Sequence, residues 1–181
     1  MSIANLVTLA RLFAVPLAIW LILDAEYAAA FWLFVAAGVS DMVDGTIAKL
    51  MNQRSELGAL LDPIADKVLL VSMCVTLGLA GRLPSWLVIL VVFRDVLIVG
   101  GYLLAMALSQ PIRSRPLAVS KLNTGMQIVL VAAVLSQLGL GLGDRRIVEI
   151  LVYAVAATTV LSGAGYVGRW WRGFDAAEPE P

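Results

Sequence analysis

The feature that most constrains the fold is a series of six apolar segments, each about as long as a helix that crosses a membrane. They cover residues 5–23, 28–50, 57–79, 85–108, 121–142 and 147–166. Hydrophobic residues make up 61% of the chain and charged residues only 14%, whereas about a quarter of the residues in a soluble domain are charged. We therefore expect an all-α polytopic membrane protein, a bundle of six transmembrane helices.

The six segments predict one domain, because the sequence shows no internal repeat and no second region of different composition. This membrane domain is expected to span residues 1–174, with an acidic, disordered tail at 175–181. A loop is expected at 109–120, where two prolines interrupt the apolar pattern. The N-terminal segment is expected to be the first structural helix and not a signal peptide, since Arg11 interrupts it and no cleavage site of small residues follows.

Four aspartates lie within this apolar sequence, at Asp41, Asp44, Asp62 and Asp66. Helix residues three or four apart share a face, so each pair would point in one direction. Two such helices facing each other would gather four carboxylates, which cannot all stay ionised without compensation. A pair of divalent cations is the simplest compensation. The alternative, acids that only cap helix ends at the membrane surface, suits a single aspartate better than two face-sharing pairs.

The sequence contains no histidine, which excludes histidine-based nucleophilic chemistry and histidine metal sites. A bound metal would therefore be a hard cation held by oxygen, namely magnesium, manganese or calcium. The one cysteine, Cys74, permits no intramolecular disulfide and is expected to be a buried thiol. The net charge is zero, so charge gives no reason to expect nucleic-acid binding.

Lysines and arginines near the segment ends predict the orientation in the membrane. One side, with both termini and the aspartates, carries most of them: Lys49, Arg54, Arg113, Arg115, Lys121, Arg169 and Arg172. The other side carries Arg82, Arg145 and Arg146. The active site is therefore expected to face the cytoplasm. We expect a bacterial plasma membrane, because the chain shows no long basic presequence, with a mitochondrial inner membrane as the alternative.

Small and polar residues surround the aspartates. Gly45, Ala48 and Gly58 would allow close approach of another helix or of a bulky ligand. Lys49 and Ser55 could hold phosphate oxygens. Two oxygen-bound metals beside a cleft of small residues suit a pyrophosphate substrate, because the metals would neutralise the phosphate charge.

The pattern Asp41-x2-Asp44-Gly45-x2-Ala48-Lys49-x8-Gly58-x3-Asp62-x3-Asp66 resembles the signature of the CDP-alcohol phosphatidyltransferases, with lysine where that family usually has arginine. The resemblance implies a six-helix membrane bundle that is often a homodimer, with two divalent cations, Mg²⁺ or Mn²⁺. It also implies that the four aspartates are the metal ligands. The residues that would contact the CDP group are Asn5, Thr8, Gly45, Ala48, Lys49, Ser55 and Gly58.

The same resemblance implies the reaction. Asp66 would be the general base that deprotonates the hydroxyl of an acceptor alcohol. The resulting oxygen would attack the lipid-side phosphorus, and CMP would leave without a covalent enzyme intermediate.

Other stretches, at 52–67, 94–96 and 120–127, are similar to the CMP-forming cardiolipin synthases of this family. That similarity implies CDP-diacylglycerol as donor and phosphatidylglycerol as acceptor. Phosphatidylglycerophosphate synthases tend to carry Arg-Glu in place of Arg94-Asp95, with a further arginine that suits glycerol-3-phosphate. This acceptor remains the alternative.

Four cations are the candidates for holding the acceptor phosphate: Arg94, Arg113, Arg115 and Lys121. The three arginines also have another interpretation. Arg94 could form an internal salt bridge with Asp95, and the two loop arginines could set topology or contact anionic lipids.

The rival from a different functional class is a small cation transporter or channel that uses the aspartates as an ion path. Such a protein would have acids spaced along a pore and an inverted repeat. Here the acids cluster between residues 41 and 66 and no repeat is visible, which favours the enzyme. A membrane scaffold would have no use for four carboxylates.

Overall fold

The computed structural model describes the backbone of residues 3–51, 56–107 and 118–175, and the side chains within 10–40, 67–101 and 118–169. Over these ranges the chain forms six helices and no strand. They are α1 (Ile3–Leu23), α2 (Tyr27–Met51), α3 (Glu56–Leu79), α4 (Ser85–Ala107), α5 (Ala118–Leu140) and α6 (Arg145–Asp175). The prediction of an all-α fold with six helices is confirmed.

Two helix boundaries differ from the expected ones by more than two residues. Helix α6 continues to Asp175, well beyond the expected end at 166, because arginine and tryptophan are compatible with a helix even where the apolar run has ended. Helix α5 already begins at Ala118, inside the expected loop, since a proline restricts the residue before it more than those after it. The rest of that loop, 108–117, and residues 176–181 of the expected tail lie outside the described residues.

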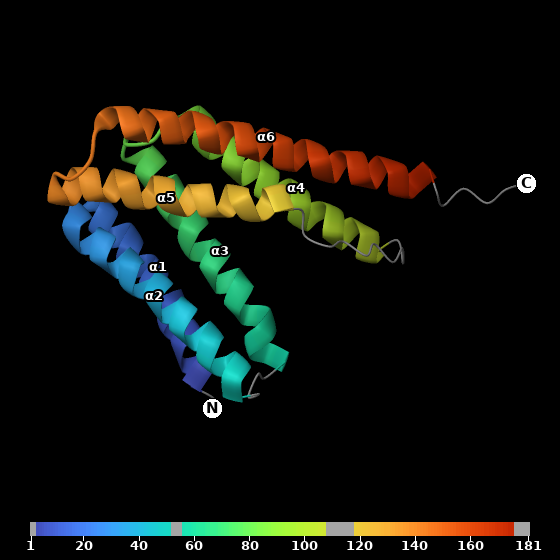
Figure 1. The fold of residues 1–181 in the computed structure, drawn as a ribbon, viewed down its shortest axis with the longest axis horizontal. Helices are drawn as coiled ribbons and strands as arrows, with labels where there is room; N and C mark the ends of the chain where they lie inside the picture. Colours follow the sequence, from blue (N-terminus) through green and yellow to red (C-terminus); the bar gives the residue numbers. More distant parts are fainter. Residues whose placement is uncertain (1–2, 52–55, 108–117, 176–181) are drawn as a thin grey trace, which may run out of the picture.

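The helices form two groups that meet at α5 (Figure 1). Helix α1 packs against α2 and α3, while α6 packs against α4 and α5. Helix α5 joins the groups, mainly through α2 and more weakly through α3. In the described residues α2 and α3 do not pack directly on each other, so space remains between them under α5. This space becomes the cavity of the candidate site.

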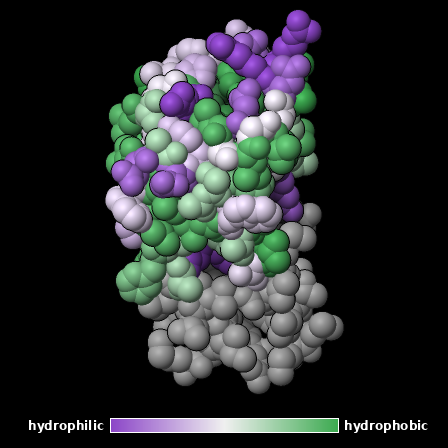
Figure 2. All heavy atoms as spheres, turned by 90° about the vertical axis from the view of Figure 1, so that its left-hand side faces the viewer, coloured by the Kyte–Doolittle hydropathy of each residue, from purple (hydrophilic) through white to green (hydrophobic). Residues whose placement is uncertain are grey.

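The interior of the bundle is apolar, and so is much of its outside. Fully buried side chains include Ile22, Met73, Leu77 and Leu135. Large apolar side chains also point outward, with 69% exposure for Phe13, 62% for Phe93 and 67% for Ile150. Figure 2, which views the end where α1 turns into α2 and α5 into α6, shows hydrophobic residues between the hydrophilic ones on the described surface. Exposed apolar area on this scale indicates an apolar environment or partner.

Two helices, α5 (Ala118–Leu140) and the Arg145–Arg169 part of α6, are long and apolar enough to cross a membrane by length and composition. Three shorter apolar stretches lie in the described parts of the other helices, at Ala10–Leu23, Tyr27–Ser40 and Lys67–Leu79. The described residues thus support part of the six-span prediction.

A close backbone contact fixes the start of α2 against the end of α5. A Cβ atom at Gly139 would overlap the backbone of Tyr27 and Ala28, so only glycine permits this approach. The contact sets the distance between the two helices at the end remote from residues 41–51.

Candidate functional site

The aspartate pairs fall in the halves of α2 and α3 that are connected through residues 52–55. With a rise of 1.5 Å per residue, Asp41 and Asp66 lie about 15 Å along their helices from this connection, and Asp44 and Asp62 about 10 Å. The two pairs therefore stand at matching levels on two antiparallel helices. Their side chains lie outside the described residues, so their coordination of a metal stays a prediction.

The other predicted contacts to the donor nucleotide lie on the same three helices. Asn5 and Thr8 belong to α1, Gly45, Ala48 and Lys49 to α2, and Gly58 to α3, with side chains that are not described. Ser55, Arg113 and Arg115 lie outside the described residues altogether. Among the described side chains, no three acidic, histidine or cysteine residues are grouped so that they could hold a metal. The side chains of the four aspartates are not among the described ones, so this finding does not concern their predicted role as metal ligands.

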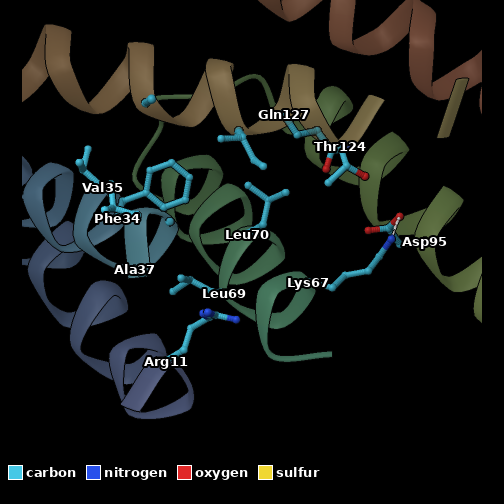
Figure 3. A pocket seen from close by; sticks show the side chains of 14 residues that line it. Arg11, Phe34, Val35, Ala37, Lys67, Leu69, Leu70, Asp95, Thr124 and Gln127 are labelled. Carbon is cyan, nitrogen blue, oxygen red and sulfur yellow. Dashed lines mark ion pairs between the residues drawn. The ribbon is translucent and has the colours of Figure 1, made fainter. Parts of the chain in front are cut away.

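A cavity of about 630 Å³ lies directly beyond the level of the aspartates. It is bounded by α2 and α3 on its sides and by α5 above, with contributions from α1 and α4 (Figure 3). Gly38 and Lys67 line it about 20 Å and 17 Å from the 52–55 connection, within a turn or so of Asp41 and Asp66. The cavity therefore continues from the place where the aspartates are predicted to act.

Most of the cavity wall is apolar, and its polar groups come from four helices. The apolar part includes Phe34, Val35, Leu69, Leu70, Ile128 and Ala132. The polar residues are Arg11 on α1, Lys67 on α3, Asp95 on α4, and Thr124 and Gln127 on α5. In Figure 3, Lys67 and Asp95 point toward each other, and Thr124 and Gln127 lie on α5 close to them. A cavity with one polar region and a long apolar wall suits an amphipathic ligand.

An ion pair closes the polar region on the side of α4. The Nζ atom of Lys67 lies 2.8 Å from Oδ1 of Asp95, and Nη1 of Arg94 lies 2.7 Å from the same oxygen. Asp95 and Arg94 are buried, while the Lys67 side chain is 40% exposed. One carboxylate thus serves two cations, so this group keeps a net charge of about one positive unit.

Every nitrogen of the Arg94 guanidinium group donates a hydrogen bond within the protein. Besides the bond to Asp95, Nε and Nη2 donate to Oγ of Ser162, at 3.1 Å and 2.7 Å, and Nη2 also donates to Oγ of Ser120. These bonds tie α4 to α5 and α6. The internal salt bridge that the sequence left as an alternative for Arg94 is therefore present. A contact between Arg94 and the acceptor phosphate stays a prediction, as does one for Lys121, which lies exposed in the first turn of α5.

Two buried amide nitrogens on α5, in Asn123 and Gln127, have no hydrogen-bond partner in the described structure. Oδ1 of Asn123 lies 2.8 Å from Thr158 Oγ1 and 2.9 Å from Thr159 Oγ1. Both hydroxyls also lie within bonding distance of carbonyls of α6, and each carries one proton. Exchanging the oxygen and nitrogen of the Asn123 amide would therefore satisfy its nitrogen at the same place. Gln127 has no such neighbour.

Sequence reasoning assigned no role to the residues that line the polar region. Lys67 entered only as the last residue of the similar stretch 52–67, and Asp95 only as a partner for Arg94. Thr124 and Gln127 entered only as part of a similar stretch. The available signal was the spacing of Asn123 and Gln127, amides four residues apart in an apolar segment, which places both on one buried face.

Comparison with known proteins identifies the class of this site. The profile of a family described as CDP-alcohol phosphatidyltransferase matches residues 1–161, which include all four aspartates and the cavity. The chain belongs to this family. This is the family that the spacing of the aspartates predicted.

Its relatives carry the names of two different enzymes. The chain is 35% identical to a chloroplastic CDP-diacylglycerol–glycerol-3-phosphate 3-phosphatidyltransferase of Oryza sativa, over 92% of this chain and 56% of the rice protein. It is 33% identical to the CMP-forming cardiolipin synthase of Rattus norvegicus, over 91% of this chain and 60% of the rat protein. It is also 39% identical to a putative cardiolipin synthase of Mycobacterium tuberculosis, over 55% of this chain and 48% of that protein. The chain spans little more than half the length of the first two.

Proposed function

We propose that the protein transfers the phosphatidyl group of CDP-diacylglycerol to a hydroxyl of phosphatidylglycerol, giving cardiolipin and CMP. The observation that carries this proposal is the cavity between α2, α3 and α5, which continues from the level of the aspartates and is mostly apolar. Both substrates are lipids, and a lipid acceptor needs such a wall whereas a water-soluble acceptor does not. The similarity to cardiolipin synthases of rat and human supports the same acceptor.

The aspartate segment is proposed to hold two divalent cations, Mg²⁺ or Mn²⁺. The ligands would be Asp41, Asp44, Asp62 and Asp66, an all-oxygen set that fits either metal. Their matching levels on α2 and α3 support this assignment. When bound, the metals would supply charge neutralisation at the pyrophosphate and lower the pKa of the acceptor hydroxyl.

In the proposed reaction, Asp66 takes the proton of the acceptor hydroxyl. The hydroxyl oxygen forms a bond to the lipid-side phosphorus, and the bond from that phosphorus to the oxygen of CMP breaks. CMP leaves with the electron pair of the broken bond. The residues proposed to hold the CDP group are Asn5, Thr8, Gly45, Ala48, Lys49, Ser55 and Gly58.

The charge of the polar region favours a phosphodiester acceptor. Lys67 and Arg94 share the single carboxylate of Asp95, so their group has a net charge of about +1, which matches the single negative charge of a phosphodiester better than the double charge of a phosphate monoester. The alternative acceptor is glycerol-3-phosphate, and the specific observation in its favour is the 35% identity to the rice enzyme. Arg94, Arg113, Arg115 and Lys121 remain the proposed contacts for the acceptor phosphate.

We further propose that all six helices cross the membrane and that two copies form a homodimer. The outward apolar side chains of α1, α4 and α6 support an integral membrane protein. The distribution of lysine and arginine supports a cytoplasmic active site, in a bacterial plasma membrane.

The test is an activity assay on purified protein with CDP-diacylglycerol and Mg²⁺ or Mn²⁺, in which phosphatidylglycerol and glycerol-3-phosphate are offered separately and CMP release is followed. CMP release with phosphatidylglycerol alone is the expected result. Release with glycerol-3-phosphate alone would keep the mechanism and overturn the acceptor. The Asp66→Asn variant is expected to lose turnover while still binding CDP-diacylglycerol, and retained activity would remove Asp66 as the base.

A further inference from the structure

We propose that Gln127 determines specificity for the acceptor lipid by donating a hydrogen bond from its side-chain amide to an ester carbonyl of that lipid. The acyl chain that follows the ester would lie along the apolar wall of the cavity. The inference rests on the proposed function, because that function makes the acceptor a diacyl phospholipid.

The first observation is the unpaired amide of Gln127. The residue is 97% buried, since only 3% of its surface is exposed, yet its Nε2 has no partner in the described structure. A buried donor without an acceptor is unfavourable, and few remain in folded proteins without a reason. Gln127 lines the cavity although its Nε2 atom is itself enclosed, so a rotation of the side-chain amide would bring Nε2 to an oxygen of a ligand in that cavity.

The second observation is the apolar wall beside this amide. Phe34, Leu70 and Ile128 line the same cavity, and Gly38 leaves open space where a side chain would stand. A free water-soluble alcohol would gain nothing from these surfaces. An acyl chain gains free energy from leaving water for such a surface, and its ester carbonyl would bring an acceptor without a proton to the amide.

The third observation is the order in space of the polar groups between the aspartates and the Gln127 amide. The Lys67–Asp95 pair lies in the polar region, Thr124 of α5 follows it, and Gln127 lies about one turn farther along α5 (Figure 3). A hydroxyl at Asp66, a phosphodiester near Lys67 and an ester near Gln127 would follow this order. The carboxylate of Asp95 can accept a hydrogen bond from a glycerol hydroxyl, a donor group that the pyrophosphate of the other substrate lacks. The polar region therefore suits the acceptor lipid better than the donor.

The decisive variant is Gln127→Met, which keeps the length of the side chain and removes the donor. We expect the KM for phosphatidylglycerol to rise about fivefold, the loss expected for one hydrogen bond, with the KM for CDP-diacylglycerol unchanged. The melting temperature should be unchanged or higher, because no hydrogen bond within the protein is lost. Gln137→Met, the same substitution on α5 outside the cavity wall, is the matched control and should change neither KM.

A second pair of variants tests the apolar wall. Gly38→Leu would fill open space in the cavity, whereas Gly125→Leu places the same side chain on an exposed position of α5 outside the cavity. Gly38→Leu is expected to raise the KM for dioleoyl phosphatidylglycerol about tenfold and that for the dihexanoyl form much less, since less chain has to be accommodated. Gly125→Leu should not distinguish the two chain lengths.

Phosphatidylglycerol retention by the purified protein, measured by native mass spectrometry, separates this inference from the proposed function. If the wild type releases no CMP with phosphatidylglycerol but retains it, and Gln127→Met weakens that retention, the function fails and the lipid site stands. If the Gln127→Met variant has a raised KM for CDP-diacylglycerol, the cavity serves the donor and the inference is overturned. Unchanged KM values with a lowered melting temperature would make Gln127 a purely structural residue and would also overturn it.

Discussion

Two groups of buried polar residues, one around Arg94 and one at Gln127, differ in how their hydrogen bonds are satisfied. Around Arg94, every guanidinium nitrogen has a partner within the protein, and these partners join α4 to α5 and α6. At Gln127, which is equally buried, the amide nitrogen has none in the described structure. Both lie in an apolar bundle where an unsatisfied polar group is costly.

This difference in hydrogen bonding indicates different roles: the Arg94 cluster stabilises the fold, whereas Gln127 is available to bind a ligand. The guanidinium group of Arg94 already uses every nitrogen within the protein, so the main contribution of its cluster is to fix the packing of the helices. An unsatisfied group beside a cavity retains that capacity for a ligand. Substitutions in the Arg94 cluster should therefore change stability first, whereas those in the cavity wall should change substrate affinity first.

The largest effect is expected for Arg94→Met. It leaves Asp95 buried beside Lys67 alone and removes the bonds to Ser120 and Ser162, so the free energy of unfolding should fall by about 3 to 5 kcal/mol. Unfolding in mixed detergent micelles, followed by tryptophan fluorescence, measures it. The exposed Arg146 provides the control, as Arg146→Met should change the value by less than about 0.5 kcal/mol. Equal losses in the two variants would remove the distinction between the two groups.

Asp95→Asn should destabilise less, by about 2 kcal/mol, because asparagine can still accept one hydrogen bond where the carboxylate served two cations. The same unfolding measurement applies. Glu149→Gln, at an exposed pair with Arg145 whose atoms lie 3.4 Å apart, is the control and should have almost no effect. A stable Asp95→Asn protein would show that the two cations do not depend on this carboxylate.

Ser162→Ala should cost about 1 to 2 kcal/mol of unfolding free energy, because it removes the acceptor shared by Nε and Nη2 of Arg94. Catalytic parameters of the folded protein should remain close to those of the wild type. A raised KM for either lipid, with unchanged stability, would instead place Ser162 near a substrate.

The smallest change in stability is expected for Lys67→Met, below about 1 kcal/mol, since the side chain is partly exposed and its ion pair is correspondingly weak. Its effect on the acceptor should be larger, with a KM for phosphatidylglycerol raised about threefold, because the residue lines the cavity. Because Lys67 pairs with Asp95 of the Arg94 cluster and also lines the cavity, this variant tests both groups in one protein.

The sequence predicted the number of helices and nearly all their positions because apolar runs of this length have few other folds. It could not predict that α6 continues to Asp175, since its last part has no apolar pattern to mark the end. It could not predict either that the described parts of α2 and α3 leave room for a cavity under α5, because that arrangement depends on tertiary packing.

The aspartate motif was visible from its spacing alone, and the family match bears out the class that it implied. The polar wall was harder to see, because its members come from four different helices. Arg94 illustrates the limit. Its place in the sequence allowed either a salt bridge or a phosphate contact. The structure shows the salt bridge to Asp95 and, in addition, hydrogen bonds to serines on α5 and α6 that are up to 68 positions away.

The glycine contact between α5 and α2 has a mechanical consequence. Gly139 brings the two backbones together at one end, so they have no side chain between them that could yield. Because α2 and α5 are in backbone contact at this end, they can move apart only at their opposite ends. A lipid that enters the cavity sideways between α2 and α5 must therefore pass where Gly38 and Thr124 stand, on the side toward the aspartates. Such a path would deliver the polar end of the molecule ahead of its chains.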